Sequence, residues 1–117
     1  MQVDVYEGET LVGTATLEHL DAPMRVAFGP FRPTDHFESN AHANVIDGQY
    51  VGDNGRSLNA TADQHGPLAA AIAIMDCADP RMGKELSLVF QDGENFAAIF
   101  AAHPDYRAYY PAPENGS

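Results

Sequence analysis

The chain has 117 residues, a length that suits one domain and is too short for two ordinary ones. Hydrophobic residues make up 44% of it, enough for a core that needs no disulfide, and Cys77 is its only cysteine. The formal net charge of −11 argues against binding nucleic acid or an anionic membrane, because both rely on Lys and Arg. We therefore predict a single globular domain over residues 1–110, followed by a flexible C-terminal tail over residues 111–117.

Neither the first residues nor the longest apolar run of the sequence predicts a secretory signal or a membrane span. The first residues lack a basic region followed by an apolar stretch, and the longest apolar run, Leu68 to Met75, is far too short for a membrane helix. There is also no glycine-rich phosphate loop and no dinucleotide fingerprint. We expect a cytoplasmic protein that carries no cofactor.

The N-terminal third reads as strands. Residues 2–6 and 11–17 alternate apolar and polar side chains around Glu7-Gly8-Glu9, which predicts a hairpin. A spacing of two over residues 24–28 predicts a third strand, and the glycine and prolines that follow predict a loop over residues 29–34.

The middle of the chain holds one unclear stretch and three further extended segments. Residues 35–43 fit either a short helix or an irregular loop. Asp47-Gly48 predicts a tight hairpin, because this pair suits turns with positive φ. Residues 56–62 alternate again, and Leu68 to Met75 is apolar on both faces. The latter predicts a central strand covered on both sides, with a buried helix as the open alternative.

The C-terminal third combines a strand with helical segments. Residues 79–83 predict a turn, and residues 86–90 predict a strand. Asp92 is placed to cap a helix whose Phe96, Ile99 and Phe100 would share one face, and His103-Pro104 would end it and start another turn. The sum is an α+β fold, mainly antiparallel β: a strand meander, as a curled sheet or small barrel, with a C-terminal helical segment.

Three histidines and a carboxylate near the middle of the chain suggest a metal site. His36, His42 and His65 lie within 30 residues of one another, and Asp63 would share a face with His65 if that segment were extended. Two imidazoles and a carboxylate can hold a divalent metal with open positions. Their spacing matches no known metal motif, so solvated or structural histidines remain the competing interpretation.

Tyrosines gather near the C-terminus, at Tyr106, Tyr109 and Tyr110. Tyrosine is favoured at contact surfaces, so this cluster is a candidate protein-binding site; packing of a terminal helix is the alternative. No nucleophile or acid–base motif is evident, and the chain is more readily interpreted as a non-enzymatic protein-binding module. A small-ligand-binding protein using the interior of a curled sheet, and a metal-dependent enzyme using His36, His42, Asp63 and His65, remain the alternatives. The oligomeric state stays open.

Overall fold

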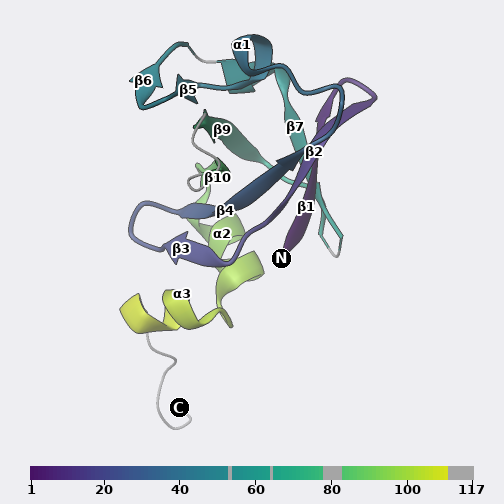
Figure 1. The fold of residues 1–117 in the computed structure, drawn as a ribbon. Coiled ribbons are helices and arrows are strands. Elements are labelled where there is room, and N and C mark those ends of the chain that lie inside the picture. The colour runs from purple at the N-terminus through teal and green to yellow at the C-terminus, as the bar shows by residue number, and fades with distance from the viewer. Residues whose placement is uncertain (53, 64, 78–82, 111–117) are drawn as a thin grey trace, which may run out of the picture.

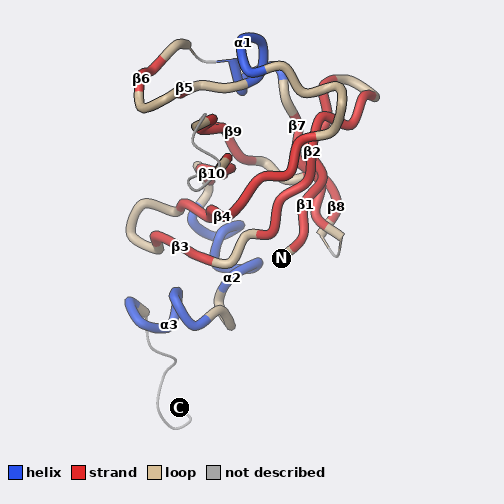
Figure 2. The backbone as a smooth tube through the Cα atoms, in the orientation of Figure 1, coloured by secondary structure: helices blue, strands red, loops and turns tan. Residues whose placement is uncertain are grey.

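A computed structural model of the chain describes residues 1–52, 54–63, 65–77 and 83–110 (Figure 1). Over these residues the protein is an α+β fold dominated by strands, with its longer helices late in the chain (Figure 2). The elements are β1 (Gln2–Glu7), β2 (Thr10–Thr16), β3 (His19–Asp21), β4 (Val26–Pro33), α1 (Ser39–His42), β5 (Val45–Ile46), β6 (Gln49–Tyr50), η1 (Asn54–Ser57), β7 (Asn59–Ala62), β8 (Gly66–Pro67), β9 (Ala70–Asp76), β10 (Lys84–Phe90), α2 (Gly93–Phe100) and α3 (Pro104–Tyr109).

The described strands join into one sheet in the order β6-β5-β9-β10-β4-β2-β1-β7-β8, and β3 pairs with β4 beside this path. Its pairs are antiparallel, except for the short parallel pair of β5 with β9. The two end strands, β6 and β8, are not paired with each other, so the sheet is open. The predicted α+β class is confirmed, in the form of an open sheet rather than a closed barrel.

Strand β4 joins the two halves of this sheet. Residues 26–30 pair with β10, residues 26–28 also pair with β3, and residues 31–33 pair with β2. The loop predicted over residues 29–34 is therefore wrong. At Gly29 a Cβ atom would overlap the carbonyl oxygen of Thr16, so the glycine permits a close crossing of the chain rather than breaking the strand.

The core is one cluster of apolar side chains drawn from both halves of the sheet and from α2. Phe90 of β10 meets Phe96 and Phe100 of α2 edge-on, with ring centroids 5.6 and 5.7 Å apart. Each of these rings contributes roughly 1.5–3 kcal/mol through burial. The other fully buried large side chains are Leu17, Ile74, Leu86, Leu88, Val3, Val5 and Val12.

Most locally encoded features agree with the predictions. The β1–β2 hairpin forms with Gly8 at positive φ, and the β5–β6 hairpin has Asp47 and Gly48 at φ of 50° and 84°. The Asp92 carboxylate accepts hydrogen bonds from the amides of Glu94 and Asn95 and caps α2. Pro104 opens α3 after His103, as predicted.

One open alternative is resolved, two segments differ from the predictions, and two lie largely or wholly outside the described residues. Residues 35–43 contain the short helix α1, which begins at Ser39 and agrees with the helical one of the two predicted alternatives. Residues 54–57 form η1 instead of extending β7. Strand β9 has one uncovered face, since Ala71 and Met75 are exposed, so the prediction of cover on both sides is wrong. The predicted turn at 79–83 falls largely outside the described residues, and the tail falls wholly outside them.

Candidate functional site

The four residues predicted as metal ligands are not gathered into one site. His36 is exposed in the loop before α1, whereas His42 is buried in α1 and only 3% exposed. Asp63 and His65 lie on the turn between β7 and β8 and line a pocket there. Within the part of the chain that the structure describes, no group of three His, Cys, Asp or Glu side chains could hold a metal ion.

His42 has structural partners on both ring nitrogens. Its Nδ1 accepts a hydrogen bond from the Glu38 amide at 2.9 Å, so in the neutral ring the proton sits on Nε2. That nitrogen lies 3.2 Å from the Glu7 carboxylate, to which it donates. The imidazole therefore ties α1 to the end of β1.

The three tyrosines of the predicted protein-binding cluster differ in their surroundings. Tyr106 is half-buried, and its ring packs at a tilt against those of Phe96 and Tyr110, with ring centroids 6.0 and 5.2 Å apart. Tyr109 and Tyr110 are 59% and 49% exposed. Tyr106 and Tyr110 also line a hollow of about 270 Å³ together with Arg25. Tyr106 thus packs α3 against α2, whereas Tyr109 and Tyr110 are largely exposed to solvent. A binding role for the cluster stays a prediction.

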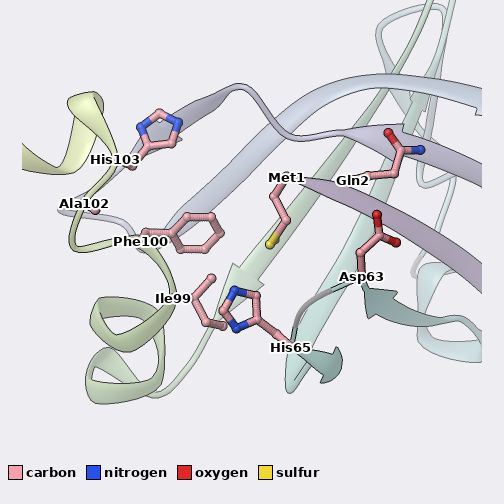
Figure 3. A pocket seen from close by; sticks show the side chains of 8 residues that line it. All are labelled: Met1, Gln2, Asp63, His65, Ile99, Phe100, Ala102 and His103. Atoms are coloured by element: carbon pink, nitrogen blue, oxygen red, sulfur yellow. The ribbon is translucent and has the colours of Figure 1, made fainter.

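A larger pocket of about 400 Å³ lies between the start of β1, the β7–β8 turn and the end of α2; we call it the β1–α2 pocket (Figure 3). Figure 3 shows the side chains of Met1, Ile99 and His65 pointing toward one another, with Phe100 beside them. Its lining residues are Met1, Gln2, Asp63, His65, Ile99, Phe100, Ala102 and His103. It therefore lies at the margin of the fold, outside the packed interior that the sequence suggested for a ligand.

The sheet also presents an apolar outer face over β4, β10 and β9. The register places Val26, Val89 and Ala71 in one row, and Phe28, Ser87 and Ala73 in the next. A third row contains Pro30, Glu85 and Met75. These side chains point away from the core, because their neighbours along each strand are the buried ones. We call this set of nine residues the outer apolar face.

Two large side chains of the outer apolar face are exposed to solvent. Met75 is 46% and Val89 37% exposed. Phe28 is half-buried and its ring lies 5.5 Å from that of His19 on β3. A hollow of about 200 Å³ at the end of the face is lined by Val45, Gly48, Met75, Asp76, Cys77, Gly83 and Glu85. The solvent-facing side of an antiparallel sheet is ordinarily polar, whereas seven of the nine residues of this face are apolar, the exceptions being Ser87 and Glu85.

The sequence carries a signal for this face, although the pattern by itself predicts a different arrangement. The run from Leu68 to Met75 is apolar at consecutive positions, which indicates cover on both sides when a strand is central. In the structure one side packs on the core and the other meets solvent. Only the pairing with β10 and β4 reveals that the uncovered side continues across three strands.

The free edge of β3, beside this face, is occupied by α3. The Asp105 carboxylate accepts a hydrogen bond from the Leu20 amide at 3.0 Å. It also lies 4.0 Å from the His19 imidazole. Helix α3 thereby covers this edge against the addition of an extra strand.

Compared with protein families, with curated proteins and with solved structures, the chain gives no match. None of the described helices combines the length and apolar character needed to cross a membrane.

Proposed function

We propose that this protein is a non-enzymatic binding module whose outer apolar face docks a basic protein partner. The observation that carries the proposal is the register, which lines up apolar side chains across β4, β10 and β9 on the side away from the core. Burying such a surface against a partner is favourable by about 25 cal/mol per Å² of apolar area. The predicted role of the tyrosine cluster is a separate, weaker candidate, since Tyr106 already packs within the protein.

Charge selects a basic partner for this face. Glu85 stands among apolar side chains and makes no ion pair within the described part of the chain, while Asp21 is exposed at the rim beside Val26. Docking would desolvate Glu85, and an unpaired buried carboxylate is costly, so the partner must bring Lys or Arg to it. The net charge of −11 adds long-range attraction for a positively charged protein.

Site-specific photo-crosslinking tests the location. A benzoylphenylalanine placed at Ala71, on the outer apolar face, is compared in a lysate of the source cells with one at Asn59, an exposed position on β7. We expect a discrete adduct with one basic protein from position 71 and none from position 59. Equal adducts from both positions, or an adduct with a second copy of the chain, would contradict the proposal.

Titration of the purified partner then tests the charge. Glu85→Lys is expected to raise the dissociation constant by about 30-fold or more, because it breaks a charge pair that is desolvated in the complex. Asp4→Lys makes the same charge change on β1 and serves as the matched control, because Asp4 lies on the outer side of the other half. Equal losses for the two variants would show that only net charge matters.

A further inference from the structure

The hollow of about 200 Å³ at the end of the outer apolar face is bordered by side chains of three neighbouring strands; we call it the end hollow. Val45 of β5 pairs with Met75 of β9, and Met75 pairs with Glu85 of β10, so these three side chains stand on one side of the sheet. Ile46, the next residue of β5, packs against the core, which places Val45 on the outer side. The end hollow is thus continuous with the outer apolar face.

The end hollow has room for one large apolar side chain. An apolar cavity of about 150 Å³ can hold a benzene molecule. Two of its lining residues are Gly48 and Gly83, and a Cβ atom built on either would meet nothing within 4 Å. The row of Val45 and Met75 continues to Tyr50 of β6, which is 66% exposed, so apolar surface extends past the hollow to the end of the sheet.

The charge around the end hollow is negative on the outer side of the sheet. Among its described lining residues Asp76 and Glu85 carry carboxylates, and none is Lys or Arg. Asp76 is already compensated, because the Lys84 ammonium lies 3.2 Å from one of its oxygens and the Ser39 hydroxyl donates to the other. Lys84 precedes Glu85 on β10 and therefore points to the opposite side of the sheet. Glu85 is left without an ion pair among the described residues.

We propose that the end hollow receives one large apolar side chain of the basic partner, while a neighbouring Lys or Arg of that partner pairs with Glu85. Glu85 itself lines the hollow, so the two partner side chains come from neighbouring residues. Anchor side chains that fill a pocket carry a large share of the binding energy in many interfaces. This inference rests on the function proposed for the outer apolar face and adds the element by which the partner is recognised.

Cys77 offers a point of attachment for peptide probes, because it lines the end hollow and is the only cysteine of the chain. The probe acetyl-Cys-Phe-Lys-amide is supplied as its mixed disulfide with mercaptoethanol. The Cys77 thiolate attacks the peptide sulfur and mercaptoethanol leaves, so the captured fraction at equilibrium can be measured by mass spectrometry. Three matched probes carry Gln or Glu in place of Lys, or Ala in place of Phe.

The probe with Phe and Lys should be captured best. We expect about three-fold less capture with Gln in place of Lys, the scale of an exposed ion pair, and less again with Glu. Replacement of Phe by Ala should lower capture by about five-fold, because the ring no longer buries apolar surface.

Two pairs of variants separate the charge from the cavity. Glu85→Gln should remove the preference for Lys over Gln and keep the preference for Phe over Ala. Asp4→Asn removes an equal charge from the outer side of the other half and should change neither preference. Val45→Phe fills the end hollow from its own wall and should lower capture of the probe with Phe and Lys. Val89→Phe, on the outer apolar face but outside the lining of the hollow, should not.

Four results would overturn this inference: no capture of any probe, capture that does not depend on the Phe ring, equal effects of Glu85→Gln and Asp4→Asn, and equal effects of Val45→Phe and Val89→Phe. If a basic protein is still crosslinked from position 71, the function of the outer apolar face stands and only the recognition element fails. Conversely, the expected probe preferences without any crosslinked partner would reject the proposed function and leave the chemistry of the end hollow as described.

Discussion

The two halves of the sheet differ on the side that faces solvent. On β1, β2 and β7 this side is polar, and the Thr16 hydroxyl donates to the Gln2 side-chain oxygen at 2.9 Å. On β4, β10 and β9 it consists mostly of Val, Ala, Phe, Pro and Met. Both halves contribute to the same core on their other side. Folding therefore constrains the inward residues of both halves, while the outward residues of the second half carry an apolar character that folding does not require.

The largest effect is expected at Gly29, where β4 passes from one half to the other. Gly29→Ala places a Cβ onto the Thr16 carbonyl, and backbone there cannot yield cheaply. We expect a loss of about 3 kcal/mol or more in the free energy of unfolding, measured by urea denaturation. Gly93→Ala is the control, since its Cβ would meet only the end of the Arg25 side chain at 3.4 Å. Equal stability of the two variants would contradict the close crossing.

A smaller loss is expected at His42, which anchors the polar half to α1. His42→Ala removes the acceptor for the Glu38 amide and the donor for Glu7 and leaves a cavity at a buried position. We expect a destabilisation of about 2 kcal/mol by thermal or urea denaturation. His36→Ala, at an exposed position, should change stability by less than about 0.5 kcal/mol. A similar loss in both variants would argue against the anchoring role.

The N-terminal cap of α2, the helix that packs on β10, is the corresponding stability test in the half of the sheet formed by β4, β10 and β9. Asp92→Ala removes the acceptor for the amides of Glu94 and Asn95 and should cost about 1 kcal/mol in unfolding free energy. Asp92→Ser should retain most of that stability, because a serine hydroxyl can accept the same bonds. If serine is no better than alanine, the carboxylate acts by charge and not as a cap.

The smallest effect on stability and the sharpest test of the comparison come from surface substitutions. Met75→Lys with Val89→Lys should change stability by about 0.5 kcal/mol each and clearly shorten retention on a hydrophobic-interaction column. Thr14→Lys with Thr61→Lys adds the same charge to the polar side and should shorten retention far less. Equal shifts would show that the two outer sides do not differ in accessible apolar surface.

Locally encoded features could be predicted from the sequence, and features set by distant contacts could not. The Asp47-Gly48 turn and the Asp92 cap depend on residues within a few positions. The prediction of a loop at Gly29 is wrong because the role of this glycine depends on Thr16, in another strand. The same holds for both candidate sites. The outer apolar face exists only through strand register, and the β1–α2 pocket combines Met1 with Asp63 and with the end of α2.

Strand β4 forms hydrogen-bonded ladders with both halves within eight consecutive residues. Both halves thus depend on this one strand, and we expect them to unfold in a single cooperative transition. Amide protons of this strand should accordingly be the slowest in the chain to exchange with deuterated solvent. A protease nick within it would separate two fragments, neither of which retains a complete set of strand neighbours.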